Sequence, residues 1–448
     1  MRVISLERVA SFIKLGGLAP QFSFAITTGY ALMGLNLLIQ LGLVPLYIQK
    51  LGKVQFGMLM IIFSFMNFAA LGVGWLSGGI ARLLGEHAAR QDHEQLAKTY
   101  ITAKVLYVGY AVVVVLLLGV IGAISFVLSG EGPASLKWDD SVWLSIGIAA
   151  LYFIAQYDFA IDRITLVAMT RQPAADLIQM VGLCVTALFV TTWLVNGGGM
   201  AGVLGGYLLG TLMARIGSWR YMKQTGLHIL PSLSRYGGMD SWKKLVGITS
   251  GGYFIYGVTL LAMQADTMVV GWLGGSALAA EFTLVWKIPE VIIQLIWRIP
   301  GALEPYIIRL DTLGRYERIQ DIYKQGLGWM LGASVLASVM YALLGHPFVM
   351  LWVGTAQAPS SQLAYVFAAL AMFWLCAVRW PAGFAHATVR LRQLNWVAGL
   401  EVVGKLTIAL MLFPKLGYTA FFIAISLVHF FGAFWMYLRL GTYSKGRT

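Results

Sequence analysis

FSFAITTGYALMGLNLLIQLGLVPL, residues 22–46, is a run of 25 residues without a single charged side chain. A helix crosses the hydrocarbon core of a bilayer with about 20 mostly apolar residues. A helix on the surface of a soluble protein carries charged or polar residues along one face, and this stretch has no such face. It therefore predicts a membrane-spanning helix.

The rest of the chain has the same character. Of its 448 residues, 59% are hydrophobic and only 11% are charged, against about 25% charged in an ordinary soluble domain. So few charges exclude a globule with a water-compatible surface. We predict an all-α integral membrane protein with about 12 transmembrane helices. The predicted spans are 22–46, 55–80, 100–129, 141–168, 174–196, 199–221, 245–272, 280–305, 324–345, 361–384, 394–413 and 417–438.

The basic residues are distributed unevenly between the two faces of the membrane. The net charge of +13 would suggest nucleic acid as a partner of a soluble protein, but cytoplasmic loops of membrane proteins also accumulate Lys and Arg. Most of the basic residues lie in the N-terminus, the loops after even-numbered spans and the C-terminus. The other face holds only Lys50, Lys53, Lys137 and Lys415. We expect both termini in the cytoplasm and no nucleic-acid partner.

The chain also has the organisation of two matching halves. At a shift of 223 residues, Gly52 falls on Gly275, and QDHEQLAKTY (91–100) lies over GRYERIQDIY (314–323). We predict an N-terminal six-helix lobe at 1–221, a cytoplasmic linker at 222–244 and a C-terminal six-helix lobe at 245–448. Parallel repeats of this kind occur in transporters. Within span 6, the glycines at 198, 202, 206 and 210 predict a ridge for close helix packing.

Span 8 contains the longest polar stripe. Lys287, Glu290, Gln294 and Arg298 follow at spacings of 3, 4 and 4, which place them on one helical face. Ionisable groups within a span usually face a watery cavity or a partner, so we predict that this stripe lines a cavity. The alternative is that Lys287 and Glu290 neutralise each other.

Arginines inside the spans are candidates for binding an anionic group. A guanidinium holds phosphate oxygens in a bidentate fashion, so Arg298 and Arg379, with Lys287, are predicted substrate-binding residues. Trp297 and Trp380 flank the two arginines and are candidates for stacking on sugars. Arg379 has the alternative of snorkelling to the cytoplasmic interface.

Arg163 is a further candidate for the substrate. Its alternatives are to snorkel or to pair with Asp158 or Asp162. The carboxylates Asp266, Asp158 and Asp162, with Glu290, are candidates for ion coupling, because a low dielectric favours a carboxyl group that is protonated or holds a cation. For Asp162 the alternative is an ion pair with an arginine.

The remaining polar residues of the spans support more than one interpretation. Asn36 and Gln40 in span 1, and Ser64 and Asn67 in span 2, either bind sugar hydroxyls or join helices. Glu401 and Lys405 are spaced as a structural ion pair one turn apart. A Walker A motif is missing, and the histidines do not have metal-ligand spacing, so we predict no catalytic residue, metal or cofactor.

Several short motifs recur along the chain. LGKVQFGMLMIIFSFMNFAALGVGWLSGGIARLLGEHAARQDHEQLAK (51–98) contains Leu-Gly, Phe-Gly and Leu-Gly-Val-Gly, then Ala-Arg and a short charged segment; QADTMVVGWLGG (264–275) and EPYIIRL (304–310) follow in the second half. On these motifs the chain resembles the polysaccharide-transport branch of the multidrug/oligosaccharidyl-lipid/polysaccharide exporter superfamily. Many relatives have an acidic residue where this chain has Ala70 and Leu71 before Gly72, so no acidic role is assigned there.

The resemblance implies a fold and a function. The fold would be two six-helix bundles in a V, as in MATE transporters. The function would be flipping an undecaprenyl-pyrophosphate-linked oligosaccharide across the bacterial inner membrane by alternating access. This step feeds synthesis of surface polysaccharide such as O-antigen, with H⁺ or Na⁺ as a coupling ion, membrane lipid around the cargo and polysaccharide polymerases as partners. The alternatives are a cation-coupled multidrug antiporter of the same superfamily, which would need an acidic cavity, and a membrane-embedded polymerase, which commonly has a large external loop.

Overall fold

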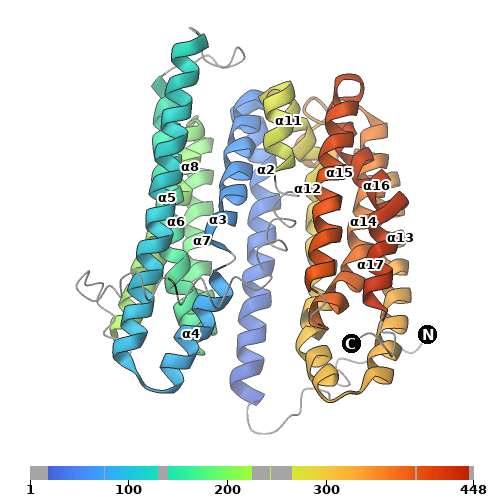
Figure 1. Ribbon diagram of the computed structural model, residues 1–448. Coiled ribbons are helices and arrows are strands. Elements are labelled where there is room, and N and C mark those ends of the chain that lie inside the picture. The colour runs from blue at the N-terminus through green and yellow to red at the C-terminus, as the bar shows by residue number, and fades with distance from the viewer. Residues whose placement is uncertain are drawn as a thin grey trace. The chain divides into compact units, whose positions relative to one another are not determined.

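The computed structural model describes residues 19–74, 76–129, 140–224, 243, 265–388 and 391–442. Every regular element within these ranges is helical, and ten helices among them are long and apolar enough to cross a membrane (Figure 1). The chain is therefore a multi-pass membrane protein, and the predicted all-α class is confirmed. Of the predicted linker 222–244, all but 222–224 and 243 lies outside the described residues, and so does the part 245–264 of the predicted span 245–272.

The chain divides into two compact units. Unit 1 consists of Met1–Leu43, Ser77–Gly122 and Asp139–Leu245, and unit 2 of Val44–Leu76, Ala123–Trp138 and Val246–Thr448. The lobe boundaries placed at 221 and 245 stay a prediction.

The first long helix, α2 (Ala19–Ala69), is broken at Gly52, which has φ 74° and ψ 170°. This region of backbone conformation is open essentially only to glycine, so the break separates the predicted spans 22–46 and 55–80. Gly275 separates α11 (Asp266–Gly274) from α12 (Ser276–Thr312) and has φ 84° and ψ 170°. The two glycines that the repeat superposes therefore share one conformation, which supports the internal repeat.

The predicted span 55–80 is not one continuous helix. α2 ends at Ala69, and the short α3 (Leu71–Gly74) precedes α4 (Ser77–Ala89). Gly72 and Gly74 belong to the Leu-Gly-Val-Gly motif, and glycine is a poor helix former. The interruption after α2 falls on Ala70, directly before this motif, and α3 ends at its last glycine.

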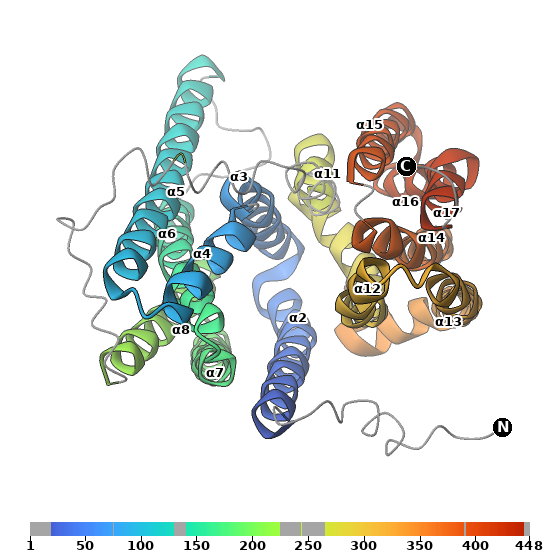
Figure 2. The same ribbon diagram turned by 60° about the horizontal axis from the view of Figure 1, so that its bottom comes forward.

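In unit 1, α5 (His93–Ser129), α6 (Asp140–Ala168), α7 (Gln172–Val195) and α8 (Met200–Gln224) lie side by side (Figures 1 and 2). The predicted glycine ridge of α8 packs against α7. A Cβ atom on Gly210 would lie 2.4 Å from the carbonyl oxygen of Gly182, and one on Gly206 would lie 2.5 Å from Val190 Cγ2. The absence of these Cβ atoms lets the two helices approach closely, so this prediction is confirmed.

Unit 2 contains a second bundle, formed by α12, α13 (Tyr316–Val353), α14 (Gln362–Ala387), α15 (Leu391–Leu416), α16 (Thr419–Val428), the π-helical turn η2 (His429–Ala433) and α17 (Phe434–Gly441). α14 packs against α12, α13, α16 and α17 and buries residues on several faces. α12 and α13 extend beyond the predicted spans 280–305 and 324–345, and the added turns carry charged residues such as Asp311 and Glu317.

The second part of α2 packs against α11 and α12 within unit 2. A Cβ atom on Gly57 would lie 1.7 Å from the carbonyl oxygen of Ser276, so the backbones nearly touch. Lys53 Nζ lies 3.2 Å from Glu281 Oε1. Residues close to the two equivalent glycines are thus joined by backbone packing and by an ion pair.

Candidate functional site

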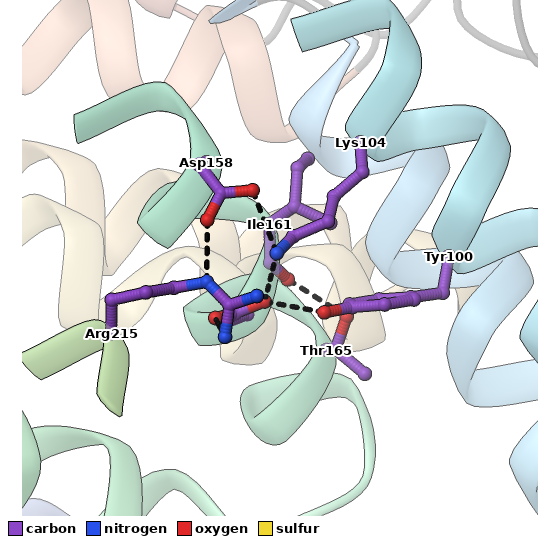
Figure 3. Close-up of polar contacts among 7 residues, drawn as sticks. Tyr100, Lys104, Asp158, Ile161, Thr165 and Arg215 are labelled. Atoms are coloured by element: carbon purple, nitrogen blue, oxygen red, sulfur yellow. Dashed lines mark hydrogen bonds and ion pairs between the residues drawn. The ribbon is translucent and has the colours of Figure 1, made fainter. Parts of the chain in front are cut away.

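Unit 1 contains a cluster of four charged side chains from three helices (Figure 3). Asp158 and Asp162 lie one turn apart on α6. Lys104 of α5 places its Nζ 2.7 Å from Asp158 Oδ1 and 3.2 Å from Asp162 Oδ1. Arg215 of α8 contacts Asp158 through Nε and lies 3.0 Å from Asp162 Oδ2 through Nη1. Tyr100 donates a hydrogen bond of 2.7 Å to Asp162 Oδ1.

The burial of this cluster is uneven. The side chains of Asp162 and Lys104 are 0% and 9% exposed, whereas those of Arg215 and Asp158 are 20% and 28% exposed. Two carboxylates face two cations, so the formal charges cancel, as burial of charge requires. The half-buried end at Asp158 and Arg215 is the part that an ion or an anionic group could reach.

An aromatic group adjoins the charged cluster. The ring of Tyr157, which precedes Asp158 in the chain, lies against those of Tyr107, Tyr110 and Phe153, with centroid distances between 4.7 and 6.0 Å. The hydroxyl of Tyr157 is buried and makes no hydrogen bond within the described part of the chain. Buried hydroxyls normally have a partner, so this group is available to a bound molecule.

A second buried carboxylate lies nearby in unit 1. Asp176 of α7 is fully buried and lies 3.4 Å from Arg163 Nη2. It accepts hydrogen bonds from Thr28 at 3.2 Å and Gln172 at 3.4 Å. The alternative that Arg163 pairs with Asp158 or Asp162 is wrong, because Arg163 pairs with Asp176 of α7 and those two carboxylates pair with Lys104 and Arg215. The alternative that Asp162 pairs with an arginine of another helix is confirmed by Arg215.

In unit 2, the predicted coupling residue Asp266 already has a cation. Its Oδ1 lies 2.6 Å from Nζ of Lys405, and both side chains are 6% exposed. Lys405 was predicted to pair with Glu401 on its own helix, whereas it pairs with Asp266 of α11, a partner that helical spacing could not indicate. A buried carboxylate with so short a contact to an ammonium is electrically satisfied.

Glu401 has its own partners one turn from Lys405. Its Oε2 accepts a hydrogen bond of 2.8 Å from the hydroxyl of Tyr437, and its Oε1 lies 3.4 Å from Nε2 of His429. His429 is 1% exposed and begins η2. These contacts join α15, η2 and α17 through polar groups in an otherwise apolar region.

The polar stripe of α12 is partly self-neutralised. Lys287 Nζ lies 3.0 Å from Glu290 Oε2, and Gln294 donates to Glu290 Oε1 at 3.2 Å. The alternative prediction for Lys287 and Glu290 is therefore confirmed. Arg298 differs from them, because its side chain is exposed and forms no ion pair or hydrogen bond with the residues that the structure describes.

The second predicted arginine, Arg379 of α14, lies against α12. Its Cζ is 5.0 Å from the centre of the Trp297 ring, a cation–π distance, while the indole nitrogen of Trp297 donates to the carbonyl of Leu375 at 3.0 Å. Trp380 instead donates to the carbonyl of Tyr323 at 3.0 Å and is buried. Trp297 and Arg379 thus form a cation–π pair, whereas Trp380 is part of the core.

The arrangement of helices has counterparts among solved structures, although no protein-family model and no curated protein sequence matches the chain. It is similar to the inward-facing form of a multidrug resistance MATE family transporter of the MOP superfamily, with a TM-score of 0.68, 14% identity, and 90% of this chain and 94% of that chain covered. It is also similar to an outward-facing form of such a transporter, with a TM-score of 0.59, 16% identity, and 94% of each chain covered. For an Asp-to-Asn variant of the Vibrio cholerae MATE transporter VcmN, the TM-score is 0.57 and the identity 13%, with 94% of this chain and 97% of that chain covered.

This chain has the MATE transporter fold. The predicted fold class is thereby confirmed. At identities of 13–16% the likeness concerns the fold alone.

The neutral candidates occupy the first two predicted spans of this MATE fold. Asn36 and Gln40 are half-buried and Asn67 is exposed, so their role as sugar ligands stays a prediction. Ser64 accepts a hydrogen bond of 3.3 Å from the backbone nitrogen of Met268. For Ser64 the helix-joining alternative is confirmed.

The participants in these clusters that were absent from the candidates include Lys104, Asp176, Arg215 and His429, with the tyrosines Tyr100 and Tyr437. Lys104 follows the charged segment that opens span 3, and Asp176 follows the Pro173 that opens α7, so both resemble residues at a membrane interface. The one sequence signal that could have identified Lys104 and Asp176 is a charged residue within an otherwise apolar helical stretch. Among the described residues of this MATE fold, no group of three or more His, Cys, Asp or Glu could hold a metal ion.

Proposed function

We propose that this protein is a membrane transporter that flips an anionic, lipid-linked oligosaccharide across the bilayer. The cargo class follows from the resemblance in the sequence: an oligosaccharide carried on undecaprenyl pyrophosphate. The fold is one that known transporters use. The choice of an anionic cargo rests on the balance of charges within the spans.

The carboxylates of the predicted spans all have basic partners in the described part of the chain. Each lies within 3.4 Å of a Lys, Arg or His nitrogen: Asp158, Asp162, Asp176, Asp266, Glu281, Glu290, Glu304 and Glu401. A transporter of cationic drugs would need a carboxylate that is free to meet its cargo. No described span offers a carboxylate that lacks a basic neighbour.

A basic residue, by contrast, remains uncompensated. Arg298 is exposed and contacts no carboxylate among the described residues, and the preceding Trp297 holds Arg379 against its ring. An unpaired guanidinium inside a span normally faces a binding site or a watery path. It presents a planar fork to phosphate oxygens, while an arginine-backed indole suits a sugar face. The unpaired guanidinium of Arg298 on α12 is the observation that carries the proposal.

A multidrug antiporter is the second candidate function. The structural likeness favours it, because the solved neighbours are described as multidrug resistance transporters. Its cation would have to displace a lysine or arginine from an existing pair, and Asp158 is the most exposed carboxylate of the unit 1 cluster. The two functions therefore make opposite predictions for Arg298 and Asp158.

The test is deletion of the gene in its host, followed by analysis of lipid-linked intermediates and surface glycan. We expect the deletion strain to accumulate the finished oligosaccharide on its carrier, with its sugar facing the cytoplasm. Arg298→Ala and Arg379→Ala should fail to restore surface glycan although both insert into the membrane. Arg318→Ala, at an exposed position of α13, is the matched control and should restore it.

Drug susceptibility of the same strains separates the alternatives. Normal surface glycan in both arginine variants would remove the proposed headgroup site. Drug sensitivity that follows deletion, is reversed by Arg298→Ala and is not reversed by Asp158→Asn would instead support the antiporter.

A further inference from the structure

We propose that His429 and Glu401 form a proton-binding site inside unit 2, which loads and releases H⁺ during the transport cycle. The binding site stands on the geometry of unit 2 alone, whereas its part in a cycle rests on the proposed function. This pair is separate from the predicted coupling carboxylates Asp266, Asp158, Asp162 and Glu290.

The contacts of His429 select the nitrogen that changes its protonation. Nδ1 lies 2.8 Å from the carbonyl oxygen of Ile425. A carbonyl only accepts hydrogen bonds, so Nδ1 carries a hydrogen and Nε2 is left to gain or lose one. Nε2 is buried, hydrogen-bonds to none of the described residues and lies 3.4 Å from Glu401 Oε1. A proton added at Nε2 therefore points toward a carboxylate.

The two protonation states differ in buried charge. With a neutral imidazole, Glu401 is a buried anion that accepts a hydrogen bond of 2.8 Å from Tyr437. With H⁺ on Nε2, the pair becomes imidazolium and carboxylate, with no net charge. Because an isolated buried charge is costly and a buried pair less so, the site binds one proton. Releasing that proton requires a rearrangement that separates or hydrates the pair.

The other ionisable groups on the helices packed against η2 do not compete for this proton. η2 packs against α15, α16 and α17. α16 has no ionisable side chain, and α17 contributes Tyr437 near the site and Arg439 in its last turn. On α15 the nearest charge is Lys405, which is held by Asp266 at 2.6 Å. α14 contributes apolar Trp374 and Ala377 to the same core cluster as Ala433.

The local backbone provides a means of rearrangement. η2 interrupts a helix that is otherwise α-helical, and π-helical turns are rare and frequently lie at functional sites. A π-helical turn holds more residues than an α-helical turn. Conversion to an α-helix would therefore rotate α17, and with it Tyr437, relative to Glu401. Such a rotation would change the contact of Glu401 with Tyr437 and the surroundings of His429 in the same movement.

The binding site can be tested without any cargo. Protein labelled with ¹⁵N-histidine in detergent micelles is titrated from pH 5 to pH 9 by NMR, and the signal of His429 is assigned by its absence in His429→Gln. We expect this signal to pass between an Nδ1–H neutral imidazole and an imidazolium. In Glu401→Gln the midpoint should change by about one pH unit or more, because the neighbouring charge is gone. Tyr437→Phe, which removes only one hydroxyl, should cause a smaller change.

His346→Gln is the matched control. His346 lies in α13 against the ring of Tyr365, so this change should leave the His429 transition in place. A His429 signal that stays in one state from pH 5 to pH 9 would overturn the proton site. So would a transition that is identical in wild type and Glu401→Gln.

The role in transport is tested separately, by surface-glycan synthesis in the deletion strain. We expect His429→Gln and Glu401→Gln to accumulate at wild-type levels in the membrane and to lose at least ten-fold in glycan formation. Normal glycan in both variants, together with a His429 transition by NMR, would keep the binding site and overturn its role in coupling. An unaltered glycan in the deletion strain itself would instead contradict the proposed function.

Discussion

Gly52 and Gly275 hold the same backbone conformation, with φ near 80° and ψ of 170° at both positions. Each lies between the end of one helix and the start of the next. A side chain at such a φ is strained whatever the surrounding space, and here nothing lies within 4 Å of either missing Cβ atom. In both halves of the chain, a glycine with positive φ therefore separates two helices. The glycine is required by its backbone conformation and not by close packing.

Replacing either glycine by alanine should lower stability. Gly52→Ala and Gly275→Ala each force an L-residue into a conformation that costs about 1–3 kcal/mol, and we expect a lower melting temperature in detergent. Gly109→Ala is the control, because Gly109 lies within α5 and also has open space around its Cβ position. Equal melting temperatures for Gly52→Ala and Gly109→Ala would contradict this account.

Gly57→Ala should destabilise the chain because of close packing, and not because of backbone conformation. Its Cβ atom would lie 1.7 Å from the carbonyl oxygen of Ser276, and backbone cannot rotate away as a flexible side chain can. We expect α2 and α12 to be pushed apart, with faster proteolysis of unit 2 and a lower melting temperature. Gly42→Ala, at a helical position with free space, should behave as wild type. If Gly57→Ala and Gly42→Ala resist proteolysis equally, the close packing of α2 against α12 is absent.

The fold was predictable because the bilayer constrains it so strongly. A span must be long and apolar and must satisfy its own hydrogen bonds, so composition and run length lead to a helical bundle. The interruptions were harder to predict. The break at Ala70 within the predicted span 55–80 and the π-helical turn at His429 follow from local geometry, and neither changes the apolar run that marks a span.

The charged clusters were only half predictable. The sequence places Asp158 and Asp162 on one face of a helix, but it does not show that Lys104 and Arg215 come from two other helices to meet them. Asp266 and Lys405 are likewise separated by most of unit 2. Helical spacing reports neighbours on one helix, whereas buried charges are paired mainly across helices. The candidates were therefore identified more successfully than their partners.

Removing one cation from the unit 1 cluster should be more harmful than removing a matched pair. Arg215→Met leaves Asp158 and Asp162 with Lys104 alone, and breaking a buried pair costs about 3–5 kcal/mol. Asp158→Asn in the same chain restores the balance of one cation and one carboxylate. We expect the double variant to melt at a higher temperature than Arg215→Met. If the double variant is the less stable of the two, charge balance does not govern this cluster.

The pair of Asp266 and Lys405 separates a structural role from a coupling role. Asp266→Asn and Lys405→Met should each be destabilising, whereas the double variant should recover much of the loss, because no unpaired charge stays buried. If Asp266 couples transport to H⁺ or Na⁺, the stable double variant should still lose the ion dependence of glycan export. An unchanged ion dependence in that variant would exclude Asp266 as the coupling group.

Cysteine labelling tests the predicted orientation in the membrane. In a background with Cys184 and Cys376 replaced by alanine, single cysteines at Asp92 and Tyr316 should react with a membrane-impermeant maleimide only after the inner face is opened. Asp92 directly precedes α5 and Tyr316 begins α13, and both lie in segments that the repeat superposes. A cysteine at the exposed Ser360, between α13 and α14, should react in intact spheroplasts. The reason is the basic excess of the loops at 92 and 316 compared with the loop at 360. Labelling of 92 and 316 in intact spheroplasts would invert the topology, and the predicted route of the cargo from the cytoplasm would be reversed with it.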